Sequence, residues 1–190
     1  MARNFAALAV VAMIALLGGM WWYSKDTTDD PFAQCRASTV AGGAGSIGGP
    51  FELVSETGET VTEADVITEP TLIYFGYTYC PDICPADSSR NAEAVEILEE
   101  DGIMVQPVLI TIDPERDTLD MVKGYVEGFD PSIIGLVASS LEENENAKAA
   151  FGVFSEKAGE PGDPYYLVNH TALTFLVNAD GSFQGTIAYE

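Results

Sequence analysis

The sequence predicts a mixed α/β domain, and two patterns carry this prediction. Near-continuous apolar runs at 71–77, 103–112 and 172–178 are typical of strands covered on both faces. Helical patterns lie between these runs, and strands that alternate with helices indicate an α/β sandwich. About 140 residues remain after the N-terminal segments, which is enough for one compact domain with its own core.

The first and last elements of this domain are predicted to be β-hairpins. Residues 51–54 and the residues around Val61 flank the polar turn 56–59, a pattern typical of two paired strands. At the other end, residues 178–181 read Asn-Ala-Asp-Gly and join the last apolar run to residues 182–189. The domain is therefore expected to open with a hairpin and to close with an antiparallel pair.

Three helices are predicted between the strands, at 85–100, 118–129 and 141–157. Asp101 and Gly102 end the first of them, because glycine commonly follows the last turn of a helix. The other two place apolar side chains on one face, which is expected to cover the sheet. These side chains are Leu119, Val122, Val126 and Phe129 in the second helix, and Ala147, Ala150, Phe151 and Phe154 in the third.

The N-terminal part of the chain is predicted to be a membrane anchor. Residues 5–23 carry no charge and end in an aromatic trio, which indicates one transmembrane helix with its aromatic residues at the interface. A cleaved signal peptide is the alternative interpretation. Arg3 precedes the span and acids follow it, so residues 1–4 are expected in the cytoplasm. This topology predicts a single-pass protein of a bacterial inner membrane with its domain in the periplasm.

Residues 24–46 are polar and then rich in alanine, glycine and serine, which predicts a flexible linker. The folded domain is expected to occupy residues 47–190. Cys35 falls in the linker and is interpreted as an incidental thiol. The other two cysteines make one pair, in a compartment that permits disulfides.

The chain carries a formal net charge of −22, from 30 acidic residues against eight basic ones. Such a surface repels nucleic acid and anionic lipid, so neither is an expected partner. The acids are dispersed along the sequence, which favours a generally solvated acidic surface over a patch for a basic partner. The sequence also contains no phosphate-binding loop, nucleophile elbow or paired-carboxylate hydrolase motif.

A pair of cysteines is the strongest chemical signal. Residues 80–85 read Cys-Pro-Asp-Ile-Cys-Pro and directly follow the first apolar run. A strand–turn–helix junction here brings two thiols together, which predicts a soft-metal or dithiol site. Because proline disfavours helical angles in the preceding residue, Cys80 is expected to be extended, and Cys84 to cap a helix that begins at Pro85. The helix N-terminus is expected to favour a Cys84 thiolate.

Residues 74–85 read Tyr-Phe-Gly-Tyr-Thr-Tyr-Cys-Pro-Asp-Ile-Cys-Pro, and this segment resembles the signature of the Sco/SenC family. Members are membrane-anchored thioredoxin-like copper proteins that help assemble cytochrome c oxidase. Similar pieces lie at 48–51 (Gly-Gly-Pro-Phe), 111–118 (Thr-Ile-Asp-Pro-Glu-Arg-Asp-Thr) and 168–171 (Val-Asn-His-Thr). The resemblance thus spans about residues 47–189 and implies a thioredoxin-like fold.

The resemblance also implies a metal site. It places Cys80, Cys84 and His170 together around copper, as Cu(I), Cu(II) or both, which suits two thiolates and one imidazole. Taken alone, the single histidine of the chain is more typical of a local hydrogen-bonding or packing residue. Zinc is the alternative metal, with Asp82 or water as a fourth ligand. Asp82 by itself is more typical of a turn.

Two departures from the family pattern stand out. Asn169 occupies the position where the family usually has aspartate, so no negative charge is expected there beside the imidazole, and copper affinity or redox tuning is expected to differ. The sequence ends at Glu190, where such proteins usually carry one more helix.

The function implied by the resemblance is that of a copper metallochaperone, which delivers copper to the dinuclear copper centre of cytochrome c oxidase. Its expected partner is the copper-bearing oxidase subunit, and periplasmic copper chaperones or thiol reductases are further candidates. The alternative is a thiol–disulfide oxidoreductase that reduces the recipient's cysteines, with Cys80 and Cys84 as its redox dithiol. The two functions differ over His170, which only the metal site requires.

Other residues near these motifs have simpler interpretations. Asp113 resembles a family residue near the cysteine loop, but Asp-Pro after a strand is also ordinary turn chemistry. Residues 115–118 are interpreted as a loop with surface ion pairs and a helix cap. In the aromatic series, alternating members are expected in the core and only the last one or two at the surface. This series comprises Tyr74, Phe75, Tyr77 and Tyr79.

Overall fold

The computed structural model describes residues 13–19, 47–160 and 162–188. The chain divides into two units, residues 1–37 and 38–190, which are described separately. In the first unit, residues 13–19 are helical and exposed. The predicted linker 24–46 lies outside the described residues, as does most of the predicted anchor. Within the described part of the chain, no helix combines the length and the apolar character needed to cross a bilayer.

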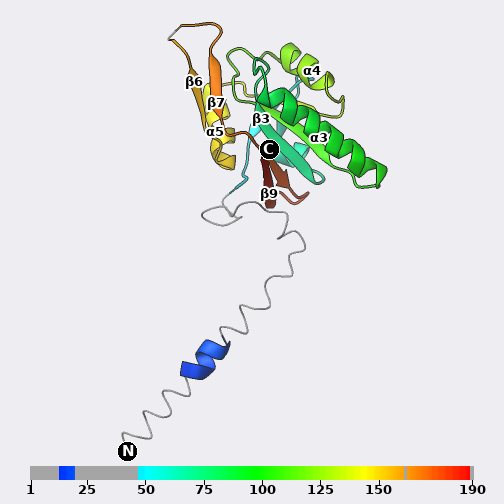
Figure 1. Cartoon of the computed structure of the whole chain (residues 1–190), viewed down its shortest axis with the longest axis vertical. Helices are drawn as coiled ribbons and strands as arrows, with labels where there is room; N and C mark the ends of the chain where they lie inside the picture. Colours follow the sequence, from blue (N-terminus) through cyan, green and yellow to red (C-terminus); the bar gives the residue numbers. More distant parts are fainter. Residues whose placement is uncertain (1–12, 20–46, 161, 189–190) are drawn as a thin grey trace, which may run out of the picture. The chain divides into compact units, whose positions relative to one another are not determined.

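The second unit is built on a seven-stranded sheet with the order β2-β1-β5-β4-β3-β8-β9 (Figure 1). The three central strands β3, β4 and β5 are parallel, and the pairs toward both edges are antiparallel. The strands are β1 Glu52–Ser55, β2 Thr60–Thr62, β3 Thr71–Gly76, β4 Gln106–Thr111, β5 Ile134–Val137, β8 Leu173–Val177 and β9 Phe183–Ala188. Both predicted hairpins are confirmed, as β1–β2 and β8–β9.

Helices cover both faces of this sheet. Alternate residues of β3 point to opposite faces. Tyr74 lines a small cavity with residues of α3 (Ile83–Glu100) and α4 (Leu119–Glu127). Its neighbour Phe75 packs against Phe151 of α5 (Leu141–Phe151), with ring centroids 5.4 Å apart. The helices α3 and α4 therefore lie on one face and α5 on the other, and all six residues of β3 are buried.

The third predicted helix, at 141–157, is too long. Helix α5 ends at Phe151 because Gly152 has a φ of 65°, a left-handed conformation that glycine adopts readily at a helix C-terminus. Residues beyond it form β6 (Ser155–Ala158), which pairs in antiparallel fashion with β7 (Leu167–His170) in a separate two-stranded sheet. Phe154 is consequently 60% exposed instead of lying on the core face of a helix.

Four short elements were absent from the sequence-based prediction. They are β5, the β6–β7 pair, and the one-turn helix α2 (Glu63–Val66). Strand β5 has only four residues, including Gly135, so its apolar pattern is too short to stand out. The predicted helices at 85–100 and 118–129 are both found, although the second ends at Glu127. Its predicted apolar face is also found, because Val122 and Val126 are buried.

Two glycine substitutions test how closely α4 packs on the sheet. A Cβ atom at Gly135 would lie 2.5 Å from Cγ1 of Val122, whereas one at Gly124, inside α4, would meet nothing within 4 Å. Gly135→Ala should lower the free energy of unfolding by about 1–3 kcal/mol through overpacking. Gly124→Ala should raise it by about 0.5–1 kcal/mol through helix propensity. Urea denaturation of both variants checks this, and equal effects would contradict the described packing.

Candidate metal-binding site

Three elements deliver the candidate ligands. Cys80 lies in the loop after β3, Cys84 is the second residue of α3, and His170 is the last residue of β7. Helix α3 begins at Ile83, two residues earlier than predicted, so Cys84 is inside the first turn and not at the cap. Pro85 is accommodated as the third residue, because the first N–H groups of a helix have no intrahelical acceptor.

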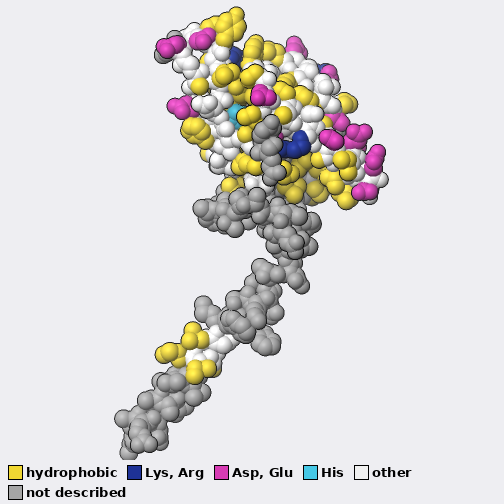
Figure 2. Space-filling view, viewed as in Figure 1, with side chains coloured by type: hydrophobic (Ala, Val, Ile, Leu, Met, Phe, Trp, Pro, Cys, Tyr) yellow, Lys and Arg dark blue, Asp and Glu magenta, His cyan; other side chains and the backbone are white. Residues whose placement is uncertain are grey.

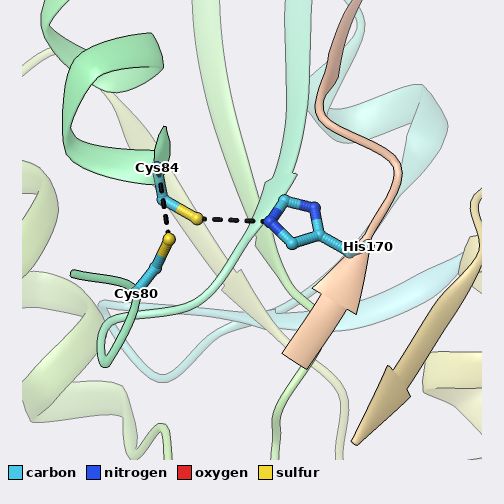
Figure 3. A group of neighbouring side chains, drawn as sticks. All are labelled: Cys80, Cys84 and His170. Carbon is cyan, nitrogen blue, oxygen red and sulfur yellow. Dashed lines mark hydrogen bonds between the residues drawn. The ribbon is translucent and has the colours of Figure 1, made fainter. Parts of the chain in front are cut away.

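The three side chains converge on one point (Figure 3). Their ligand atoms, two Sγ and one imidazole nitrogen, all lie within 4.8 Å of one another. Sγ of Cys84 is 3.4 Å from Nε2 of His170, and the backbone N–H of Cys84 donates to Sγ of Cys80 over 3.3 Å. The structure therefore brings Cys80, Cys84 and His170 together, as the sequence predicted.

The imidazole is oriented by its other nitrogen. Nδ1 of His170 is 3.1 Å from the carbonyl oxygen of Thr171, and a carbonyl can only accept a hydrogen bond. Nδ1 must therefore carry a hydrogen, and Nε2 is the ring nitrogen that faces the thiols. Such a backbone carbonyl partner is typical of metal-ligating histidines. The local structure thus selects the tautomer that can bind a metal through Nε2.

The two thiols have opposite protonation tendencies. Hydrogen bonds from the side chain of Cys84, from His170 and from backbone N–H groups lower the pKa of Cys80 to about 4, although burial opposes this shift. The adjoining Cys80 sulfur and burial raise the pKa of Cys84. The prediction that the helix N-terminus would favour the Cys84 thiolate is therefore wrong in the metal-free protein. Cys84 is completely buried, and Cys80, which receives the N–H donor, is partly exposed.

Gly76 provides the space into which the ring of Tyr74 packs beside Cys84. A Cβ atom at this position would lie 2.8 Å from Cε1 of Tyr74 and 3.4 Å from Sγ of Cys84. The first distance is too short for a Cβ atom and the second is an ordinary contact, so glycine is required here by the Tyr74 ring. The same close approach places the ring of Tyr74 edge-on to His170, with centroids 6.3 Å apart.

Tyr77 connects the cysteine loop with the strand that carries the histidine. Its hydroxyl accepts a hydrogen bond from the backbone N–H of Val168 over 3.1 Å, and its ring lies edge-on to His170 at 5.9 Å. Tyr74, Phe75 and Tyr77 are buried, while Tyr79 is 47% exposed. The expectation that only the end of this aromatic series reaches the surface is confirmed. The buried tyrosines also form part of the wall of the site, a role that the sequence pattern did not indicate.

Asp117 binds the loop that carries Cys80 through Thr78. The sequence did not indicate this role. It was interpreted as part of a surface loop, but it is only 1% exposed. Its carboxylate accepts hydrogen bonds from the backbone N–H and hydroxyl of Thr78 and from the hydroxyl of Thr111. Burial raises its pKa, and these hydrogen bonds oppose the shift. Two other interpretations of this segment are confirmed, because Thr118 caps α4 and Glu115 forms a surface ion pair with Lys157. The ion pair of Arg116 with Asp113 is instead largely buried, so it is not a surface pair.

The remaining predicted residues lie outside the ligand cluster. Asp82 occupies the N-cap position of α3 without a side-chain capping bond. Asn169 is exposed, and because successive strand residues face opposite sides, its side chain points away from the face that carries His170. The absence of an aspartate there does not remove a charge from the imidazole's own side of the strand.

Asp113 is buried and binds Arg116 and Tyr166, which exceeds the role of a simple turn residue.

A thioredoxin-like fold with a preformed Cys–Cys–His group defines a class of protein that handles soft metals or exchanges thiols. The SCO1/SenC family model matches residues 40–190. The chain therefore belongs to the SCO1/SenC family, as its sequence motifs predicted.

Individual relatives agree with this membership. Protein SenC of Rhodobacter capsulatus is 43% identical over 173 residues, which cover 91% of this chain and 76% of that protein. The mitochondrial SCO1 homolog 1 of Arabidopsis thaliana is 41% identical over 142 residues, which cover 74% of this chain but only 42% of that protein. The chain thus spans less than half the length of the plant relative.

Solved structures show the same fold. Arabidopsis thaliana ScoI with copper bound has a TM-score of 0.71 and 39% identity, over 76% of this chain and 89% of that chain. Bradyrhizobium japonicum ScoI with copper bound has a TM-score of 0.68 and 36% identity, over 74% of this chain and 88% of that chain. Both relatives were solved with copper.

The asymmetry of the two thiols predicts selective alkylation. In the reduced protein at about pH 6, iodoacetamide should modify Cys80 much faster than Cys84. The lowered pKa of Cys80 makes it a thiolate at this pH, whereas a thiol with the ordinary pKa of about 8.5 or higher is almost fully protonated. Burial should further protect Cys84. Mass-spectrometric peptide mapping over a time course checks this. The unfolded chain is the control and should label both residues at similar rates, and similar rates in the folded protein would refute the assignment.

Proposed function

We propose that this protein is a copper metallochaperone in which Cys80, Cys84 and His170 hold the copper ion as cargo. The observation that carries the proposal is the preformed cluster, whose three ligand atoms lie within 4.8 Å of one another. Two thiolates and one imidazole make a soft ligand set of low coordination number, which suits Cu(I) and accepts Cu(II) when another ligand joins. The copper-bound structures of its relatives support this choice.

Zinc fits this group less well. Structural zinc sites have four protein ligands in tetrahedral geometry. The described group has three members, and Asp82, one of the two predicted fourth ligands, is not among them, which leaves water as the other. A three-ligand site leaves copper open to attack by an incoming thiolate, which a metal carrier needs. The partly exposed Cys80 is the ligand on which such an exchange would begin.

The proposed recipient is the dinuclear copper centre in the copper-bearing subunit of cytochrome c oxidase. The family resemblance of the cysteine and histidine motifs supports this assignment. Copper would pass by exchange of thiolate ligands between the two proteins. Periplasmic copper chaperones or thiol reductases are further candidate partners, which would load copper or keep the cysteine pair reduced.

The proposal includes a membrane tether. The uncharged segment 5–23 would anchor the chain in a bacterial inner membrane, with residues 1–4 in the cytoplasm. Residues 24–46 would serve as a linker, and the copper-binding domain 47–190 would work in the periplasm. The support for this arrangement is the composition of these segments.

A second candidate function is thiol–disulfide exchange with the cysteines of the recipient. It is favoured by the asymmetry of the pair, because Cys80 has a lowered pKa and partial exposure while Cys84 is buried with a raised pKa. A thiolate of this kind attacks a disulfide, and the second thiol then resolves the mixed disulfide. Both functions use the same cysteines, so His170 discriminates between them.

The ligand set predicts a redox dependence of copper binding. The reduced domain 47–190, which lies within the second compact unit and lacks Cys35, should bind one copper ion per chain. Oxidation to a Cys80–Cys84 disulfide should abolish this binding, because it removes both thiolates. Metal analysis after gel filtration measures the stoichiometry. Unchanged stoichiometry after complete oxidation would refute the proposed ligands.

Single substitutions separate the two functions. His170→Ala should lower copper affinity by about 10-fold or more, because the imidazole is a metal ligand. The cysteines should still form and exchange a disulfide, because the imidazole is not oxidised or reduced in that reaction. Cys84→Ser should disable both activities. Copper competition titrations and disulfide exchange assays measure the two effects.

Oxidase assembly in cells then decides between the candidates. Loss of assembly with His170→Ala supports copper delivery. Full assembly with that variant would favour the reductase and contradict the metallochaperone.

A further inference from the structure

Arg116 occupies a position that the proposed function does not explain. It lies in the connection between β4 and α4, and its side chain is only 13% exposed. Figure 2 shows acidic side chains scattered among hydrophobic groups over the face in view. An arginine buried beside the metal-binding site needs several partners to offset its loss of hydration. The structure supplies hydrogen-bond acceptors for Nε and Nη1 and aromatic rings from two separate segments, while the buried Nη2 has no hydrogen-bond partner.

The first set of partners ties Arg116 to the β6–β7 pair. Its Nη1 donates to the carbonyl oxygen of Tyr166 over 2.9 Å and to that of Pro164 over 3.3 Å. Its Nε donates to Oδ2 of Asp113 over 2.6 Å, and the hydroxyl of Tyr166 donates to Oδ1 of the same carboxylate over 2.7 Å. Tyr166 is thus held through its backbone and its side chain. It directly precedes β7, the strand that ends at His170.

The second set of partners ties Arg116 to the cysteine loop. The guanidinium lies over three tyrosine rings, with its Cζ atom 3.6 Å from the ring centre of Tyr166, 4.7 Å from that of Tyr79 and 5.9 Å from that of Tyr77. Tyr79 directly precedes Cys80, and Tyr77 contacts both His170 and Val168. One cation therefore contacts the neighbours of two candidate ligands that come from distant parts of the sequence.

We propose that Arg116 is a positioning residue, which holds the β7 strand against the cysteine loop so that His170 reaches the metal bound by the two thiols. The proposal rests on the proposed function for its ligand set. Such a role needs a planar group with several donors, because one face must stack on aromatic rings while the edge donates to carbonyl and carboxylate oxygens. Lysine has the charge but lacks the planar fork, so its single ammonium group cannot stack flat on the ring of Tyr166 and also reach the carbonyl and carboxylate oxygens on different sides.

The test uses the reduced full-length protein and three variants. Arg116→Met removes the charge and the donors while keeping most of the side-chain volume. Arg116→Lys retains a positive charge beside Asp113 but lacks the planar guanidinium. It is the variant to be measured if Arg116→Met does not fold. Lys157→Met is the matched control, because Lys157 also lies over the Tyr166 ring, at 4.7 Å, but is 54% exposed and pairs with Glu115 at the surface.

Copper affinity should fall by about 10-fold in both Arg116 variants, the range typical when a residue that orients a metal ligand is lost. Lys157→Met should bind copper like the wild type. Arg116→Lys should unfold at a temperature closer to wild type than Arg116→Met does, yet bind copper no better. Combining Arg116→Met with His170→Ala should weaken binding no further than His170→Ala alone, because both changes remove the same ligand.

Two copper-binding results would each overturn the proposal: wild-type copper affinity in both Arg116 variants, or full additivity of Arg116→Met with His170→Ala. Hydrogen exchange of the metal-free protein gives an independent outcome. The amides of β7 should exchange faster in the Arg116 variants than in Lys157→Met, while those of β3 and β4 keep their protection. If His170→Ala left copper affinity unchanged, the proposed ligand set would be refuted. Equal hydrogen exchange of the β7 amides in all variants would independently refute the positioning role of Arg116.

Discussion

The site depends on the close packing of the first turn of α3 against the end of β3. Gly76 has no side chain, so the ring of Tyr74 can lie against the end of the strand, next to the fully buried Sγ of Cys84. This contact makes Cys84 the protected member of the pair and leaves Cys80 as the partly exposed one. The backbone N–H of Cys84 then stabilises negative charge on Cys80. One steric constraint thus sets the different chemistry of the two thiols.

The histidine depends on a second, separate set of contacts. It lies 86 residues beyond Cys84 and on a two-stranded sheet that does not belong to the main sheet. The β6–β7 pair is held by hydrogen bonds to Tyr77 and Arg116. A redox protein that uses only its dithiol has no need for this second support. The contacts that place an imidazole beside the thiols are therefore more consistent with metal binding than with thiol exchange alone.

The buried polar groups around the site illustrate where sequence reasoning fails. Arg116 and Asp117 stand in a run of charged residues, and such runs are usually solvated. Burial of both becomes favourable only because partners arrive from other elements, namely Thr78 and Thr111 for Asp117 and the residues around Tyr166 for Arg116. Thr111 is only six residues from Asp117, but Thr78 is 39 residues from Asp117 and Tyr166 is 50 residues from Arg116, so no local pattern indicates the full set of partners. The family-like piece 111–118 was the one signal that could have drawn attention to this segment.

The sequence by itself determined the strands β3, β4 and β8, the terminal hairpins, the main helices and the identity of the two thiols and the imidazole, because local periodicity and the resemblance of its motifs encode these features. The tertiary structure alone decided which thiol is ionised, since backbone donors and burial act differently on Cys80 and Cys84. It also decided that Asn169 faces away from the site, because the strand assignment of residues 167–170 sets the side of each residue. Short strands, buried ion pairs and protonation states depend on contacts between distant segments, which a one-dimensional pattern does not contain.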